Sequence, residues 1–351
     1  MQISREMLFA EDAFFPACHA STVLPMEHGL VLAAYFAGAH EGADDVAIYL
    51  SRRVEGVWLN PVKLAKVAEV AHWNPVLMPI PGGARLIFKV GRTIPEWKSW
   101  TMTTSDGGVT WTKPAPIPAP GESCGPVRNK PLYLSDGSML APDSVETTQS
   151  WRPRIDMSCD YGATFPAFSW IPLPEEAKAG RPVNPASQNA TRPDLPDYIT
   201  GKGAIQPTLW TSGPGKIHAL LRTSAGYIFR SDSEDFGRTW CTAYNTGLPN
   251  NNSGIDLAKL EGKLYLACNP VSGDWADRTP LVILRSDNGG KTFSPFVTLE
   301  DQLMDPRIPE IREGRRTTAE ISYPASVAKS GKQHVTYTFL RRQIVYREIT
   351  P

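Results

Sequence analysis

The sequence predicts an all-β fold, built as one six-bladed β-propeller, from three observations: a repeated eight-residue motif, its regular spacing, and a pair of short strands upstream of it. The motif has the frame Ser or Thr, any residue, Asp, any, Gly, any, Thr, aromatic. It occurs as TSDGGVTW at 104–111, SCDYGATF at 158–165, SEDFGRTW at 233–240 and SDNGGKTF at 286–293, where Asn288 replaces Asp. Four matches to five semi-fixed positions indicate an internal repeat.

Each copy of the motif lies between two runs that favour β-structure, such as AGYIFRSD before the third copy and FSPFVTL after the fourth. Asp and Gly suit a turn and the aromatic residue can anchor it, so the motif is interpreted as a structural strand-turn-strand unit. The closing aromatics are 54, 75 and 53 residues apart, and a degenerate copy, SRRVEGVW, ends at Trp58. The long interval matches a stretch rich in Pro and Asn at about 172–197, which is predicted to be an inserted loop.

Six segments share the order of a short strand, a turn with Gly or polar residues, and a second strand. They are CHASTVLPMEHGLVLAAYF, HWNPVLMPIPGGARLIFKV, RNKPLYLSDGSMLAPDS, IQPTLWTSGPGKIHALLRT, GIDLAKLEGKLYLACNP and ISYPASVAKSGKQHVTYTF. Repeats of about 50 residues with four strands each are typical of propeller blades around a central channel. We therefore expect a single domain over residues 1–351, in which the segment from Leu8 to Phe15 completes the last sheet and closes the ring.

The composition excludes several classes of function. Lys plus Arg and Asp plus Glu each number 36, so the formal net charge of zero favours neither nucleic acid nor a membrane surface as partner. The five cysteines form no CxxC pair and no D-x-D-x-D-G loop occurs, so we expect no disulfide framework, no metal and no cofactor. The start of the chain lacks a signal sequence and no apolar run approaches about 18 residues, which predicts a cytoplasmic protein without a membrane span. The oligomeric state is left open.

Polar residues recur at two positions of the predicted blades, the start of the first strand and the end of the second, which face one mouth of a propeller. They are His19, Asn74, Arg128, Asn129, Lys130, Gln206, Asp256 and Tyr323 in first strands, and Glu41, Asp44, Asp45, Lys89, Asp143, Glu146, Arg222, Asn269 and Arg341 in second strands. Each has a structural interpretation: His19 can be a hydrogen-bonded core residue, and Arg222 and Arg341 can pair with neighbouring carboxylates. Their common register favours a cleft in which carboxylates are recognised.

The eight-residue motif resembles the Asp box of sialidases and related BNR-repeat proteins, over nearly the whole chain. More narrowly, CHAS, EGADDVAIYLSRR, HWNPVL, RNKPLYLSDGSMLAPDSVE, QPTL, LPNNNSGIDL, SYP and TYTFLRR look like the predicted neuraminidase group of bacterial sialidase-like proteins. The resemblance implies a sialidase-like propeller with Tyr323 as nucleophile and Asp44 or Asp45 as acid/base. It also implies that Arg222 and Arg278 are two of three arginines that hold a sugar carboxylate.

The chain departs from the sialidase pattern at the third arginine. The usual Arg-Ile-Pro near the start is replaced by PACHAS, with His19 near its place, and Arg128 or Arg341 is the candidate replacement. This departure leaves the identity of the acidic sugar open.

Three functions are consistent with these residues. The first is a retaining exo-glycosidase that acts on a terminal acidic sugar, in which Tyr323 attacks and Asp45 protonates the leaving oxygen. The second is a polysaccharide lyase, in which His19 and a Tyr abstract the proton α to a uronate carboxylate and the 4-linked group is eliminated. The third is a carbohydrate-binding propeller without catalysis, although a mouth rich in carboxylate, His and Tyr exceeds what sugar binding alone requires.

The glycosidase is the preferred hypothesis, with an acidic glycan or oligosaccharide as partner. Across the hypotheses, the candidate catalytic residues are Tyr323, Asp45, His19 and Glu146, and the candidate substrate-binding residues are Glu41, Asn74, Arg128, Lys130, Gln206, Arg222, Arg278 and Arg341.

Overall fold

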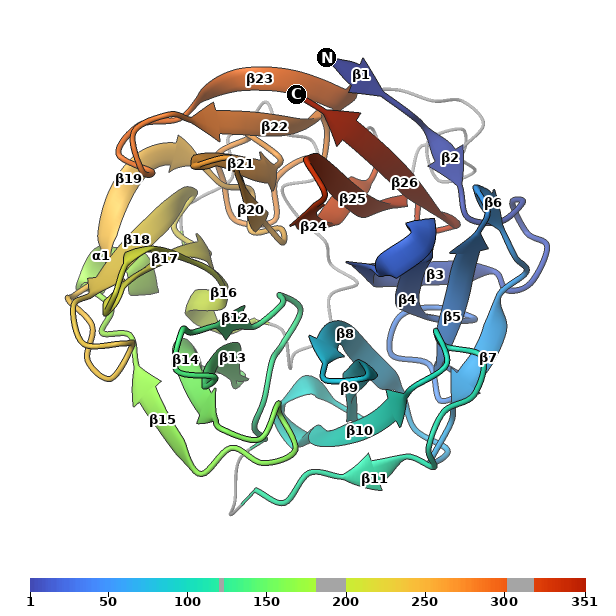
Figure 1. The fold of residues 1–351 in the computed structure, drawn as a ribbon. Coiled ribbons are helices and arrows are strands. Elements are labelled where there is room, and N and C mark those ends of the chain that lie inside the picture. The colour runs from blue at the N-terminus through green and yellow to red at the C-terminus, as the bar shows by residue number, and fades with distance from the viewer. Residues whose placement is uncertain (120–122, 181–199, 302–318) are drawn as a thin grey trace. The chain divides into compact units, whose positions relative to one another are not determined.

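The chain is built almost entirely from β-strands (Figure 1), as a computed structural model shows for residues 1–119, 123–180, 200–301 and 319–351. Within these ranges, helical structure is confined to the short helix α1 (Glu175–Lys178) and the 3-10 turns η1 (Glu27–Gly29) and η2 (Ile94–Glu96). The same ranges contain no helix that is long and apolar enough to cross a membrane. The predicted all-β class is confirmed.

Each of the six predicted strand pairs is present as two hydrogen-bonded neighbours. The pairs are β3 (Ala17–Pro25) with β4 (Val31–Gly38), β8 (His72–Ile80) with β9 (Gly83–Val90), β12 (Leu132–Tyr133) with β13 (Met139–Glu146), β16 (Lys202–Gly213) with β17 (Lys216–Thr223), β20 (Asp256–Leu260) with β21 (Lys263–Cys268), and β24 (Ile321–Lys329) with β25 (Lys332–Phe339). Their second strands are almost fully buried, as in β4, where all eight residues are buried. Continuous apolar runs such as VLAAYFAG therefore form strands covered on both faces.

A third strand follows each pair and carries one or two further strands on its far side. The third strands are β5 (Ala47–Val54), β10 (Lys98–Thr104), β14 (Ser150–Ser158), β18 (Tyr227–Ser233), β22 (Leu281–Ser286) and β26 (Gln343–Thr350). The outer strands are β6 (Val57–Trp58), β7 (Val62–Ala65), β11 (Ala115–Pro116), β15 (Ala167–Trp170), β19 (Tyr244–Pro249) and β23 (Ser294–Glu300), with β1 (Gln2–Ile3) and β2 (Glu6–Met7) beside β26.

The strands of the described residues form five sheets. Their orders are β3-β4-β5-β6 with β7 beside β5, β11-β10-β9-β8, β12-β13-β14-β16-β17-β18-β19 with β15 beside β14, β20-β21-β22-β23, and β1-β26-β25-β24 with β2 beside β26. The eight-stranded sheet joins two predicted four-stranded units, because β14 and β16 pair in parallel at Ser150 with Lys202 and at Trp151 with Gly203. The number of six blades therefore stays a prediction.

The N-terminal strands lie earlier in the chain than predicted. Strands β1 and β2 pair with β26 through residues 2–7, so the assignment of this role to Leu8–Phe15 was wrong. Leu8, Phe9 and Phe15 instead pack with Tyr35 in a buried apolar cluster. Phe9 lies 5.0 Å from Phe15 and 5.5 Å from Tyr35 between ring centres. Phe9 and Phe15 thus pack in a core and do not alternate along a strand.

The four copies of the motif form the same hydrogen-bonded turn between a third strand and an outer strand. In the first copy, the Asp106 carboxylate accepts hydrogen bonds from the backbone N–H and the hydroxyl of Thr110, at 2.9 and 2.6 Å. The Thr104 hydroxyl accepts the N–H of Gly108 at 3.0 Å, and Trp111 Nε1 donates to the Gly108 carbonyl at 3.2 Å. Asp160, Asp235 and Asn288 accept the corresponding bonds in the other copies. The predicted strand-turn-strand role of the motif is confirmed.

The chain divides into two compact units. Unit 1 comprises Met1–Asp143, Asp156–Phe168 and Ala325–Pro351, and unit 2 comprises Ser144–Ile155 and Ser169–Pro324. Each has its own apolar core, with Tyr35 and Tyr346 in a cluster of unit 1 and Trp210 and Leu266 in a cluster of unit 2. The loop predicted at about 172–197 includes α1, and its residues from 181 onward lie outside the described residues. The single domain over 1–351 stays a prediction.

Candidate active site

Four of the eight predicted first-strand residues share an unusual backbone conformation. Asn74, Arg128, Gln206 and Tyr323 have φ values of 41°, 73°, 54° and 56°, and Ala20, next to His19, has a φ of 53°. In β3, β8 and β16 this residue lies at a shift of register against the following strand. Such a β-bulge turns a side chain away from the regular alternation, and left-handed residues other than glycine concentrate at functional sites. Residues at equivalent positions of the predicted units thus share a left-handed backbone conformation.

Arg222, Tyr323 and Gln206 meet in unit 2. Arg222 lies near the end of β17, Tyr323 in β24 and Gln206 in β16. Arg222 Nη1 donates a hydrogen bond to the Tyr323 hydroxyl oxygen at 2.6 Å and another to Gln206 Oε1 at 3.0 Å. Only 2% of Arg222 and 8% of Tyr323 is exposed. The buried guanidinium therefore fixes the positions of the phenol oxygen and the Gln206 amide.

A chain of polar contacts fixes the orientation of Arg222. Its Nε donates to Asn252 Oδ1 at 2.9 Å, and Asn252 Nδ2 donates to Asp274 Oδ1 at 2.6 Å. The other carboxylate oxygen of Asp274 is paired with Lys202 Nζ. Asn252 is fully buried and has a left-handed φ of 55°. The Asn252 amide therefore links the Arg222 guanidinium to the ion pair of Asp274 and Lys202, and this link restricts where the guanidinium can lie.

Three aromatic rings surround the Arg222 guanidinium. Its Cζ lies 5.8 Å from the ring centre of Trp151, 5.7 Å from that of Trp275 and 5.4 Å from that of Tyr323. Arg278 Cζ lies 5.7 Å from the Trp275 ring and 5.4 Å from the Tyr323 ring. Two cations therefore share the same two rings, and each such cation–π contact contributes roughly 0.5–2 kcal/mol.

Arg278 forms a buried ion pair with Glu320. Its Nη1 donates to Glu320 Oε1 at 2.7 Å, and the hydroxyl of Ser322 donates to the same oxygen at 3.1 Å. No described residue accepts a hydrogen bond from Nη2 of Arg278 or from Nη2 of Arg222. Because guanidinium N–H groups bind carboxylates well, these two nitrogens are the donors that an anionic ligand can use.

His19, Glu41 and Arg341 of unit 1 line one small open hollow, together with Cys18, Phe36 and His40. Arg341 and Glu41 form an ion pair. The His19 ring packs edge-on against Phe36, with 5.7 Å between the ring centres. Burial raises the pKa of the Cys18 thiol, which is therefore protonated and a poor nucleophile.

Asp45, the predicted acid/base, is exposed and lies in the loop of unit 1 between β4 and β5. Its two carboxylate oxygens accept the backbone N–H of Ala39 at 3.2 and 2.9 Å. The neighbouring Asp44 lies 3.8 Å from Arg92 Nη1, in a pair in which both side chains are more than half exposed. The structure thus gives Asp45 a definite conformational role in addition to the catalytic role predicted for it.

The remaining predicted residues have contacts of their own. Arg128 Nη1 donates to the Ser21 carbonyl at 3.1 Å. Glu146 accepts the Ser144 hydroxyl at 2.7 Å. Asn74 is buried in β8 and Lys130 is half-buried. Among the described residues, no group of three or more His, Cys, Asp or Glu side chains is placed to hold a metal ion.

The sequence from residue 29 to residue 335 matches the family model of the BNR repeat-like domain. The chain belongs to the BNR repeat-like family. Within this family match lie Arg222, Arg278 and Tyr323, whereas His19 and Arg341 lie outside it. No curated protein matches the sequence.

Solved structures place this BNR repeat-like chain among proteins of sialidase-like fold. A protein of unknown function from Dyadobacter fermentans is 12% identical, with a TM-score of 0.70 over 99% of this chain and 98% of that one. The Hadza microbial sialidase Hz136 is 13% identical, with a TM-score of 0.67 over 99% of this chain and 68% of that one. The Trypanosoma rangeli sialidase, solved with 2,3-difluorosialic acid as a covalent intermediate, is 14% identical, with a TM-score of 0.66 over 98% of this chain and 58% of that one.

Several residues of the unit 2 cluster were missed by sequence reasoning. Asn252, Asp274 and Trp275 lie in loops, and Glu320 precedes β24 by one residue. The signal that the sequence offered was the run of three Asn residues at 250–252 in LPNNNSGIDL. In the structure all three are fully buried polar residues in a loop. Buried polar residues in a loop require partners, which here include Arg222.

Proposed function

We propose that this BNR repeat-like protein is a retaining exo-glycosidase that hydrolyses a terminal acidic sugar from a glycan. The observation that carries the proposal is the 2.6 Å hydrogen bond from buried Arg222 to the hydroxyl oxygen of Tyr323. A neutral phenol is a weak nucleophile, and a positive charge held against its oxygen stabilises the phenolate that attacks. The sialidase-like fold supports the same reaction, since one of the similar structures is described as a covalent intermediate with a fluorinated sialic acid.

The proposed reaction has two steps. In the first, the Tyr323 oxygen bonds to the anomeric carbon while the glycosidic C–O bond breaks, and an acid gives a proton to the leaving oxygen. In the second, water replaces the tyrosine oxygen on the sugar and the proton returns to the acid. A phenol nucleophile suits an acidic sugar, because a carboxylate nucleophile would be repelled by the sugar carboxylate. Asp45 is the candidate acid/base.

Arg222 and Arg278 have different roles in this proposal. Arg222 engages Nε and Nη1 with Asn252, Gln206 and Tyr323, so it chiefly holds the nucleophile. Among the described residues, Arg278 donates through Nη1, to Glu320, which leaves a guanidinium edge for a ligand. We therefore assign the sugar carboxylate mainly to Arg278.

A uronate lyase is the second candidate function, and the hollow that His19 shares with Arg341 favours it. An arginine beside a uronate carboxylate makes the α proton more acidic, and a neutral histidine is a suitable base for that proton. The 4-linked group would then leave without the addition of water. In this case Tyr323 would not form a covalent bond to the sugar.

A panel of acidic glycans distinguishes the two candidates. Sialosides, Kdo-capped oligosaccharides and uronate-containing oligosaccharides are incubated with the protein, and products are followed by mass spectrometry and ultraviolet absorbance. The glycosidase proposal expects products that have gained one water and no new absorbance. Products without added water that absorb as an unsaturated uronate would replace it by the lyase, and binding without any product would leave a carbohydrate-binding protein.

Two tyrosine variants test the nucleophile. We expect Tyr323→Phe to lose hydrolysis while remaining folded, with a melting temperature lowered slightly because the buried Arg222 guanidinium loses one acceptor. Tyr265→Phe is the matched control, because Tyr265 is also buried in unit 2 and its ring packs against Phe296. A fluorinated acidic sugar should leave a covalent adduct on Tyr323 in intact-protein and peptide mass spectra. Full hydrolysis by Tyr323→Phe would reject the assignment.

A further inference from the structure

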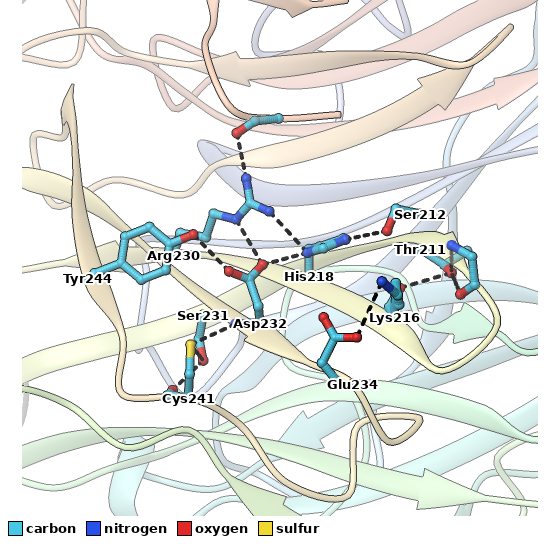
Figure 2. A network of polar contacts seen from close by, with 12 residues as sticks. Thr211, Ser212, Lys216, His218, Arg230, Ser231, Asp232, Glu234, Cys241 and Tyr244 are labelled. Carbon is cyan, nitrogen blue, oxygen red and sulfur yellow. Dashed lines mark hydrogen bonds and ion pairs between the residues drawn. The ribbon is translucent and has the colours of Figure 1, made fainter. Parts of the chain in front are cut away.

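A second polar cluster lies in unit 2, at the other ends of β16 and β17 from Gln206 and Arg222. Figure 2 shows Ser212, His218 and Asp232 in a row across three neighbouring strands. His218 of β17 is opposite Asp232 of β18 in the strand register. Ser212 comes from the end of β16, beside the turn that leads into β17. The candidate glycosidase site uses none of these residues.

The distances in this cluster join a hydroxyl, an imidazole and a carboxylate. His218 Nε2 lies 2.7 Å from the Ser212 hydroxyl oxygen, and His218 Nδ1 lies 2.5 Å from Asp232 Oδ1. A nucleophile, a base within hydrogen-bond reach and a third group that orients the base are the arrangement of nucleophilic catalysis by serine. It is recognised by this geometry and not by positions in the sequence.

The histidine ring and the carboxylate are both held in place. Trp210 stacks on the His218 ring with 5.0 Å between ring centres and 29° between planes. Asp232 also accepts hydrogen bonds from the Tyr244 hydroxyl at 2.7 Å and from Arg230 Nε at 2.9 Å. Burial raises the pKa of Asp232, but the hydrogen bonds from His218, Tyr244 and Arg230 outweigh it and lower the pKa to about 2. The carboxylate is therefore ionised at neutral pH.

Two groups of opposite charge face His218 Nδ1. Arg230 Nη2 lies 3.0 Å away and Asp232 Oδ1 lies 2.5 Å away. Arg230 Nη2 can only donate and the Asp232 carboxylate can only accept, so Nδ1 cannot form a hydrogen bond with both. We assign the hydrogen bond to the shorter contact, with Asp232, which places the ring proton on Nδ1 and leaves Nε2 to accept from the Ser212 hydroxyl.

We propose that Ser212 is a nucleophilic serine that accepts acyl groups from small carboxylic esters. The Ser212 oxygen bonds to the ester carbonyl carbon while His218 Nε2 takes the hydroxyl proton. The ester C–O bond then breaks, and His218 returns the proton to the leaving alcohol. Water releases the acyl group as a carboxylic acid by the same path in reverse.

The position of Ser212 determines the kind of ester. Ser212 is exposed, next to the β16–β17 turn, so an ester reaches it directly from solvent. The acyl chain meets an open surface there, which suits acetyl and other short acyl groups. General-base activation by His218 alone gives an acceleration of roughly 10²–10⁴ over an ordinary hydroxyl.

Acetylation by p-nitrophenyl acetate tests the proposal on the full chain. The protein is treated briefly, and acetylated residues are located and quantified by peptide mass spectrometry. Ser294 is the internal reference, since it is also exposed in unit 2 but its hydroxyl contacts only the Arg285 carbonyl, at 3.4 Å. We expect Ser212 to be acetylated at least tenfold faster than Ser294. Equal rates at the two serines would overturn the proposal without any variant.

Variants then assign the base. His218→Gln keeps a hydrogen-bonding side chain but removes the base, so acetylation of Ser212 should fall to the rate of Ser294. Ser212→Ala should lose the label at this position, and Ser294→Ala should leave Ser212 reactivity unchanged. Tyr323→Phe should also label normally, because this site does not depend on the proposed glycosidase. Undiminished acetylation of Ser212 in folded His218→Gln would refute the role of the histidine and with it the proposal.

Discussion

Arg222 and Arg278 contact the same two aromatic rings but use their N–H groups differently. Arg222 donates two bonds from Nη1, one of them to Tyr323, whereas Arg278 donates to Glu320 and keeps Nη2 available. We expect Arg222→Lys to lower kcat by roughly 10²–10³, because an ammonium cannot reproduce these donors, and to change KM little. Arg278→Lys should chiefly raise KM for the acidic sugar.

Steady-state kinetics on the best glycan of the panel separate these two effects. Circular dichroism and melting temperature show whether each variant is folded, and a neutral analogue of the same sugar provides the control for Arg278. The assignment of roles would be reversed if Arg222→Lys raised KM at constant kcat. Equal losses in both variants would mean that the two arginines bind the carboxylate as one unit.

Single residues differ in how far their sequence context reveals their contacts. Arg222, Gln206 and Tyr323 were predicted together because each occupies a set position in a strand pair, and they do meet in unit 2. Asn252 and Asp274 were not predicted, because they lie in loops and their positions depend on how those loops fold over the strands. Periodicity describes strands, whereas a loop contact depends on tertiary structure.

The Asp-box turn is the element whose stability contribution can be tested most directly. Asp106 accepts bonds from the backbone and hydroxyl of Thr110, while the side chain itself is exposed. We expect Asp106→Ala to lower the free energy of unfolding measurably, because N–H and hydroxyl groups of the turn lose their acceptor. Chemical denaturation followed by tryptophan fluorescence measures the change.

The fourth copy of the motif provides the matched control. Asn288 accepts the N–H of Thr292 at 3.0 Å and donates from Nδ2 to its hydroxyl at 2.8 Å, so an amide can replace the carboxylate in this turn. Asp106→Asn should therefore retain most of the stability that Asp106→Ala loses. A loss of hydrolysis in Asp106→Ala at unchanged stability would contradict the structural role of the turn.

Elements with strong local signals were predicted well, and those without were not. The six strand pairs combine apolar runs with a turn that often contains Gly, and all six are present. The N-terminal strands were misplaced, because β1 and β2 contain only two residues each and the aromatic segment after them has the stronger apolar pattern. Leu8, Phe9 and Phe15 of this aromatic segment pack in the core around Tyr35 instead.

At the scale of the whole molecule, the sequence predicts the fold better than the site. The sequence repeat predicts the order of the strands, because every copy of the repeat contains the same local sequence signals. The site depends on side chains far apart in the chain, such as Arg222 and Tyr323, whose contact spans 101 residues. A shared register shows that such residues occupy equivalent positions, but not which atoms touch or which residue serves the substrate.

The two ends of the chain meet in one sheet of unit 1, and Ser4 is placed to test their contribution to stability. The Ser4 N–H donates to the Glu348 carbonyl at 3.0 Å, and the Glu348 N–H donates to the Ser4 hydroxyl at 2.9 Å. Ser4→Ala removes one of these bonds, which should cost roughly 1 kcal/mol of unfolding free energy. Ser4→Pro also removes the backbone donor to Glu348 in the segment that links β1 to β2, and should cost roughly 1–3 kcal/mol more.

Thermal unfolding of both variants measures this difference, with Gln2→Ala as the control for a change in the neighbouring strand β1 that keeps every backbone donor. If Ser4→Pro loosens β1 and β2 from β26, the exposed edge of β26 should also increase aggregation on heating, because an unpaired strand edge can pair with another chain. A Ser4→Pro variant as stable as Ser4→Ala would show that the N-terminal strands contribute little. The closure of this sheet would then depend on the aromatic cluster of Phe9 and Phe15.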